Sequence, residues 1–146
     1  MDDSSSHKAT KTRNFDAERL EELARIVVDC GFRIHRDLGP GLLESAYEMM
    51  LCAALKERGL QFQCQLQVPI TYRGVMVENA FRADILVEDL LLVELKSTEL
   101  HAAVHAKQLL TYLRLMGLPL GLLMNLGMAS YKDGVRRIAN NYYASH

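Results

Sequence analysis

Hydrophobic residues follow two different periods along the chain, and these periods separate helices from strands. Apolar side chains recur at steps of three and four in three stretches, so each stretch is predicted to form an amphipathic helix. Glycines near the ends of these stretches, including the LGPG stretch at residues 38–41, are typical of helix termini. The helices are expected over about residues 15–38, 41–58 and 102–116.

Between and after these helices, apolar residues alternate with polar ones or form short continuous runs, which predicts strands. Pro69 indicates an edge strand or a bulge, and residues 72–74 are expected to form a turn. The segment GVRRIANNYY, residues 134–143, is expected to add an edge strand or a short helix. The order of elements predicts an α/β fold, with a mixed central sheet of four to five strands flanked by helices. The main strands are expected over about residues 62–68, 81–87, 90–96 and 118–126.

The hairpin FRADILVEDLLLVELKSTEL, residues 81–100, carries charged residues inside its strands. Its apolar odd-numbered residues should share one face of the sheet, so odd positions must pair with odd positions. A two-residue turn would instead pair odd-numbered positions of one strand with even-numbered positions of the other. A three-residue loop centred on Asp89, or a bulge, keeps them together and sets Asp84 opposite Glu94. The apolar odd positions of the first strand, expected on one face, are Ala83, Ile85 and Val87.

Two carboxylates in adjacent positions need a cation, because like charges directly opposite each other destabilise a sheet. A divalent metal would supply it, since Mg²⁺ favours one or two carboxylates together with waters and phosphate oxygens. A local salt-bridge cluster of Arg82, Asp84, Glu94 and Lys96 would supply it equally well. The geometry of the hairpin alone leaves both interpretations open.

Composition sets broad limits on this picture. A chain of 146 residues is close to the commonest domain size, and residues 1–14 are polar without an apolar period. We therefore expect a disordered tail at residues 1–14 and a single domain over residues 15–146. The net charge of -1 neither supports nor excludes nucleic acid as a partner. Three cysteines without a CxxC pair indicate the cytoplasm, and no apolar run approaches the roughly 18 residues that cross a membrane.

Asp84, followed after a turn by Glu94 and Lys96, resembles the signature of the PD-(D/E)XK nuclease superfamily, with Ala83 in place of the proline. The segment GPGLLESAYE, residues 39–48, resembles the signature of the GxxExxY protein family, a branch of that superfamily. The segment AKQLLTYLRLMGLPLGLLMNLG resembles the glutamine-containing helix and following strand of the same family. The three blocks occur in the right order, and the resemblance spans about residues 28–140.

The resemblance implies a restriction-endonuclease-like core of helix, three strands, helix and strand. It also implies a nuclease that depends on Mg²⁺ or Mn²⁺ and acts on nucleic acid, with DNA as the expected substrate. The implied catalytic residues are Glu44, Asp84, Glu94, Lys96 and Gln108. The implied metal ligands are Asp84, Glu94, the Leu95 carbonyl and Glu44. Supporting roles are expected for Tyr47, Tyr112 and Glu48.

Three functions remain compatible with the sequence. The first is the nuclease, and the second is a non-catalytic module that binds nucleic acid or works as an accessory within a larger complex. The third is a purely structural partner protein. No membrane partner is expected, and homodimer formation stays open.

Overall fold

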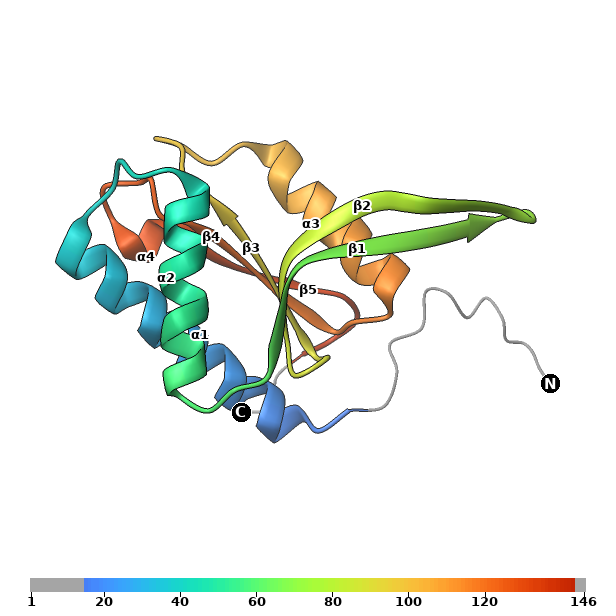
Figure 1. The fold of residues 1–146 in the computed structure, drawn as a ribbon, viewed down its shortest axis with the longest axis horizontal. Helices are drawn as coiled ribbons and strands as arrows, with labels where there is room; N and C mark the ends of the chain where they lie inside the picture. Colours follow the sequence, from blue (N-terminus) through green and yellow to red (C-terminus); the bar gives the residue numbers. More distant parts are fainter. Residues whose placement is uncertain (1–14, 144–146) are drawn as a thin grey trace.

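The computed structural model describes residues 15–143, and the tail expected at residues 1–14 lies outside the described residues. Helices α1 and α2 cover one face of a sheet and α3 covers the other (Figure 1). Among the helices within residues 15–143, none has both the length and the apolar composition needed to cross a membrane. The elements, in chain order, are α1 (Ala17–Leu38), α2 (Glu44–Glu57), β1 (Phe62–Tyr72), β2 (Val75–Val87), β3 (Leu91–Lys96), α3 (Ala103–Met116), β4 (Leu120–Asn125), α4 (Tyr131–Gly134) and β5 (Val135–Ala139).

All three predicted helices form, and local chemistry explains where they begin. At the start of α1 the Asp16 side chain accepts a hydrogen bond of 3.1 Å from the Arg19 N–H, which satisfies one free donor of the first turn. Helix α2 begins only at Glu44, later than expected. The delay arises because Gly39 and Gly41 adopt φ angles of 75° and 112°, which a continuing helix does not allow.

The sheet is mixed, with the strand order β1-β2-β3-β4-β5. Strands β3 and β4 are parallel and are joined through α3, whereas the other neighbours are antiparallel. The predicted mixed sheet flanked by helices is therefore confirmed. Of the two alternatives expected for residues 134–143, the edge strand forms as β5, whereas the helical turn α4 precedes this segment and ends at Gly134. Pro69 lies in the edge strand β1, where the register against β2 shifts between Val68 and Ile70.

Strands β1 and β2 exchange their faces at the level of Gln65. Phe62 packs against the core beneath α1 and α2, whereas Leu66 packs against the core beneath α3. A regular strand would keep both on one face, but Gln65 has a φ of 53° and breaks the alternation. On β2 the same exchange separates Ile85 from Ala83. The expectation that Ala83 and Ile85 share a face is therefore wrong, because the strand turns over between them.

Beyond this exchange, β1 and β2 continue as a two-stranded arm that extends away from the rest of the sheet (Figure 1). Strand β2 pairs with β3 only from Ile85 to Val87. The arm closes at Arg73 and Gly74, whose φ angles of 50° and 82° are those of a two-residue hairpin turn, as expected for residues 72–74. Asp84 thus stands where β2 leaves the sheet and enters the arm.

Candidate metal and active site

The loop between β2 and β3 consists of three residues and is centred on Asp89. Glu88 and Asp89 have positive φ angles of 53° and 54°, and the Leu90 N–H closes the turn on the Val87 carbonyl at 3.0 Å. The prediction of an odd loop is confirmed, and continuing the register by one step sets Asp84 opposite Glu94. The pairs across the loop, which all join residues of equal parity, are Val87 with Leu91, Leu86 with Leu92 and Ile85 with Val93.

The Asp84 and Glu94 carboxylates each bind the backbone of the opposite strand. The Asp84 N–H donates to Oε2 of Glu94 at 2.8 Å, and Oδ2 of Asp84 accepts from the Leu95 N–H at 2.8 Å. These contacts begin where the regular ladder between β2 and β3 ends, at Ile85 and Val93. Side chains therefore take over the hydrogen bonds of the ladder and hold the two carboxylates next to each other.

Glu94 is buried, with 6% of its surface exposed. Burial, and then the negative charge of Asp84, raise the pKa of Glu94 to about 8. The hydrogen bond from the Asp84 N–H and the positive charge of Lys96 act in the opposite direction. At pH 7 this carboxyl group would hold a proton unless a further cation stood beside it. A divalent cation between the two carboxylates would remove the electrostatic cause of the shift.

Helix α2 places two more carboxylates beside this pair. Glu44 and Glu48 lie one turn apart on the same side of the helix. Burial raises the pKa of Glu48, and the charge of Asp84 raises it further, while a hydrogen bond from the Gln65 side chain opposes the shift. Glu48 thus lines the same cavity as Asp84 and is affected by its charge, and the four-residue spacing from Glu44 was the sequence feature that pointed to it. A cavity of about 360 Å³ is lined by Glu44, Ser45, Glu48, Gln65, Arg82 and Asp84.

The salt-bridge cluster that the sequence left open does not form. Within residues 15–143, no ion pair joins Arg82 or Lys96 to Asp84 or Glu94. Lys96 is half-buried and follows Glu94 by two positions on one strand, so both side chains leave the same face of β3. Arg82 is exposed and lines the acidic cavity. Both cations are therefore in a position to meet an anionic ligand.

The donor set suits a hard divalent cation that takes few ligands from the protein. Among the described residues, no group of three or more His, Cys, Asp or Glu side chains could hold a metal ion, which argues against a closed zinc site. Mg²⁺ needs only one or two carboxylates, which Asp84 and Glu94 supply. The Leu95 N–H points at Asp84, and the N–H and C=O of one strand residue point to the same edge. The Leu95 carbonyl therefore faces the carboxylate pair as a third donor.

Helix α3 brings Gln108 and Tyr112 towards the same carboxylates. Burial, and then the charges of Glu94 and Asp84, raise the pKa of Tyr112, whereas the nearby Gln108 side chain lowers it. Tyr112 also stacks on Phe81, with ring centroids 3.9 Å apart and ring planes at 9°. Tyr112 is thus fixed between Phe81 and Gln108 and can orient the Gln108 amide.

Tyr47 fixes the loop from which Glu44 starts. Its ring is fully buried, and its hydroxyl group donates to the Gly39 carbonyl at 2.6 Å and accepts from the Leu42 N–H at 3.3 Å. The Ser97 hydroxyl donates to the Leu42 carbonyl and ties the same loop to the end of β3. Tyr47 therefore positions the first turn of α2 and lies behind the acidic cavity.

A buried asparagine holds the loop that follows Lys96. Asn125 is 1% exposed, and its Oδ1 accepts from the N–H groups of Thr98 at 3.0 Å and Gly127 at 3.1 Å. Its Nδ2 donates to Oγ1 of Thr98 at 3.0 Å. A Cβ on Gly127 would lie 2.5 Å from the Thr98 backbone nitrogen, so only glycine allows this approach. Asn125 was not among the predicted functional residues, and the feature of the sequence that could have indicated it is a single amide within an apolar strand.

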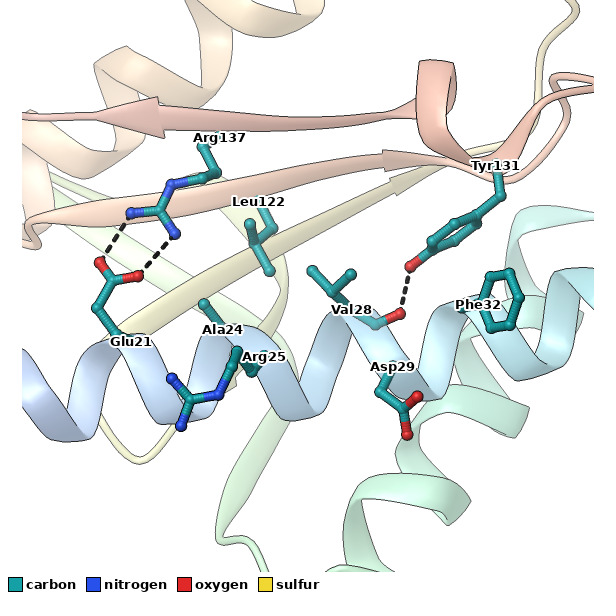
Figure 2. A pocket seen from close by; sticks show the side chains of 9 residues that line it. All are labelled: Glu21, Ala24, Arg25, Val28, Asp29, Phe32, Leu122, Tyr131 and Arg137. Atoms are coloured by element: carbon teal, nitrogen blue, oxygen red, sulfur yellow. Dashed lines mark hydrogen bonds and ion pairs between the residues drawn. The ribbon is translucent and has the colours of Figure 1, made fainter. Parts of the chain in front are cut away.

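A larger cavity of about 630 Å³ lies beside α1, between that helix and strands β4 and β5 (Figure 2). Its walls are mainly apolar and include Val28 and Leu122. Arg137 is bound to Glu21 by two hydrogen bonds of 3.0 and 2.8 Å, and the Tyr131 hydroxyl donates to the Val28 carbonyl at 2.6 Å. Because it presents no adjacent carboxylates, this cavity suits phosphodiester chemistry less well than the smaller acidic one.

Comparison with known proteins adds one finding. Residues 21–138 match the family model described as the PD-(D/E)XK nuclease superfamily. The matched range runs from α1 into β5 and contains both strands of the carboxylate pair. No curated protein and no solved structure matches the chain.

Proposed function

Because this chain belongs to the PD-(D/E)XK nuclease superfamily, we propose that it is a metal-dependent nuclease that hydrolyses phosphodiester bonds in DNA. The observation that carries the proposal is the adjacent pair of Asp84 and Glu94, with Lys96 on the same face of β3 and in no ion pair with another residue of the described range 15–143. A phosphodiester is anionic and resists attack by water, so its hydrolysis needs this combination of cation-binding carboxylates and a nearby ammonium group.

Asp84, Glu94 and the Leu95 carbonyl are the proposed ligands of Mg²⁺ or Mn²⁺. When bound, such a cation neutralises phosphate charge and lowers the pKa of a coordinated water. Glu44, which the resemblance implies as a fourth ligand, lines the same cavity as Asp84, and we propose that it binds the cation through a water molecule rather than directly. Deprotonated Asp84 and Glu94 are required for this role, so binding of the cation must displace the proton that Glu94 otherwise holds.

The remaining residues of the site act on the substrate. The Lys96 ammonium is proposed to stabilise the charge that develops on the phosphate. Gln108, held by Tyr112, is proposed to orient the attacking water or a phosphate oxygen. Tyr47 supports Glu44 through the loop at residues 39–42 and does not touch the reacting atoms.

Three finer assignments belong to the same proposal. The spacing of Gly41, Glu44 and Tyr47 supports membership of the GxxExxY branch. A cytoplasmic location is proposed because the number of cysteines is odd and the three described cysteines are free thiols. Homodimer formation stays a prediction that sedimentation would test.

The proposal is tested by incubating the purified protein with single-stranded and double-stranded DNA and RNA, in Mg²⁺, in Mn²⁺ and in excess chelator. We expect cleavage of DNA that needs the cation, and loss of cleavage in Glu94→Gln. Glu99→Gln is the matched control, because Glu99 is exposed beyond the end of β3 and lies outside the acidic cavity. Cleavage that survives in Glu94→Gln, or that persists in chelator, would contradict the assigned site.

A non-catalytic module that binds nucleic acid or assists a larger complex is the second candidate. The nearly neutral net charge of -1 favours it, because tight binding of nucleic acid usually requires a positively charged surface. For this alternative, calorimetry would detect Mn²⁺ binding that depends on Asp84 and Glu94, while no substrate would be cleaved under any of the conditions above.

A further inference from the structure

The larger cavity beside α1 is bounded at both ends by contacts between α1 and the C-terminal elements. At one end the Glu21 carboxylate binds Arg137 of β5 by two hydrogen bonds of 3.0 and 2.8 Å. Towards the other end the Tyr131 hydroxyl group donates to the Val28 carbonyl at 2.6 Å, and the Tyr131 ring meets Phe32 edge-on with centroids 5.8 Å apart. The volume of about 630 Å³ lies within the usual range of small-molecule sites.

The surface between these contacts is apolar. Figure 2 shows Ala24 and Val28 pointing from α1 towards Leu122 of β4. Ala24 and Leu122 form a floor that is only 3% and 0% exposed, so a ligand would mainly contact the residues around them. Val28 and Tyr131 are half-buried, and Phe32 is 46% exposed, which is high for an aromatic ring. An apolar ligand would remove this surface from water.

The charged residues of the cavity leave one positive charge without a partner. Four charged side chains line it, and Glu21 is bound to Arg137 while Asp29 is bound by two arginines of the helices α1 and α2. Arg25 is exposed, and no ion pair joins it to another residue of the described range 15–143. A carboxylate is the matching ligand group, because its two oxygens accept hydrogen bonds from the guanidinium fork.

The spacing along α1 defines the shape of the ligand. Val28 and Phe32 follow Arg25 by three and seven positions, so the three residues lie on one side of the helix. At 1.5 Å per residue, Arg25 and Phe32 are about 10 Å apart along the helix axis, which is close to the length of an extended octanoate. The ligand is therefore elongated, with an anionic head at one end and an apolar body.

We propose that this cavity binds a medium-chain fatty carboxylate, with the carboxylate on Arg25 and the alkyl chain running along α1 to Phe32. The site is independent of the proposed nuclease activity, because no residue lines both this cavity and the acidic one.

The first experiment titrates the full chain with octanoate and follows the backbone amides by NMR. We expect saturable shifts at Arg25, Val28, Phe32 and Leu122. Octanol has the same apolar body without the charge and should bind about fivefold more weakly, which is the upper end for an exposed ion pair. Octylammonium should bind more weakly still, because it meets the like charge of Arg25. Equal affinities for octanoate and octanol, shifts confined to other parts of the chain, or no saturation would overturn the proposal.

The second experiment assigns the two ends of the ligand. Arg25→Gln should weaken octanoate binding about fivefold and leave octanol binding unchanged, so that both ligands bind equally well. Phe32→Ala should weaken the binding of both ligands. Arg114→Gln is the matched control, because Arg114 is exposed on α3, which covers the other face of the sheet. Equal octanoate affinities for Arg25→Gln and Arg114→Gln would overturn the proposal, and the ligand series on the wild type decides it even if a variant folds poorly.

Discussion

Asp84 and Glu94 hold each other in place, because the backbone N–H of Asp84 donates to the Glu94 carboxylate while the Asp84 carboxylate binds the strand that carries Glu94. The arrangement keeps two acids adjacent in a largely buried position, which raises the pKa of Glu94 to about 8. Without a cation the two adjacent carboxylates destabilise the folded protein. With a cation between them, the same two carboxylates would form a binding site. The same pair therefore links stability, pH and metal binding.

The pH dependence of stability in chelator tests this link. The pKa of Glu94 is about 8 in the folded protein and 4.5 for an ordinary solvated glutamate, so the folded state binds more protons than the unfolded state between these values. The contribution of Glu94 to the free energy of unfolding should therefore fall as the pH rises from about 5 to 8, by up to ~1.4 kcal/mol per pH unit. Thermal melting across this range is the measurement.

Other groups titrate in the same range, so the difference between wild type and Glu94→Gln isolates this contribution. Glu94→Gln keeps an oxygen that can accept a hydrogen bond from the Asp84 N–H but does not ionise. Its melting temperature should therefore exceed that of the wild type by a margin that grows as the pH rises. Added Mg²⁺ should raise the melting temperature of the wild type at pH 8 and leave that of Glu94→Gln unchanged. A constant difference between the two proteins across the pH range would contradict the assignment.

Lys96→Ala tests the ammonium group on the same face as Glu94. Removing one charged group that stabilises a transition state typically lowers kcat by about 100- to 1000-fold, and we expect a loss in that range. Lys96 is half-buried and forms no ion pair with another described residue, so we expect Lys96→Ala to have nearly the same melting temperature as the wild type. Lys107→Ala is the matched control, because Lys107 is exposed on α3. Equal cleavage rates for the two variants would remove Lys96 from the site.

The helices, the mixed sheet and the carboxylate pair could be predicted because each depends on a local repeat. Parity predicted a three-residue loop around Asp89 or a bulge, since either keeps the apolar residues next to the loop in β2 and β3 on one face, and the structure has the loop. That loop in turn determined that Asp84 stands opposite Glu94. The pairing was therefore accessible before any coordinates were available, and the match to the superfamily over residues 21–138 agrees with it.

The exchange of faces at Gln65 was not predictable by the same reasoning. A glutamine in a strand gives no sign that it will adopt a φ of 53°, because a positive φ is uncommon for any residue other than glycine. The exchange moved Ala83 to the other core and brought Gln65 to Glu48.

Tyr47→Phe tests whether the loop before Glu44 matters for cleavage. The variant removes a hydroxyl group that bridges the Gly39 carbonyl and the Leu42 N–H, which should cost about 1 kcal/mol of stability and loosen the first turn of α2. Cleavage should fall several-fold while the substrate range stays the same. Kinetic assays and thermal melting of the same samples provide both readouts.

Tyr131→Phe is the control for this prediction. The Tyr131 hydroxyl donates one hydrogen bond of 2.6 Å to the Val28 carbonyl, beside the larger apolar cavity and apart from the carboxylates (Figure 2). It should therefore lose a similar amount of stability without a change in the cleavage rate. If both variants lose activity in proportion to their stability, Tyr47 has no specific role in positioning Glu44.

Asn125→Ala tests the amide that organises the loop after Lys96. The variant leaves the N–H groups of Thr98 and Gly127 without their shared acceptor, Oδ1, in a partly buried position. Each unsatisfied buried donor costs about 1–3 kcal/mol, so we expect a total loss of roughly 2–4 kcal/mol in the free energy of unfolding. Asn79→Ala is the matched control, since Asn79 is exposed on the arm and its removal should change stability by less than about 0.5 kcal/mol. Denaturant unfolding of the two variants measures the difference, and equal midpoints would show that water replaces the Asn125 amide without loss.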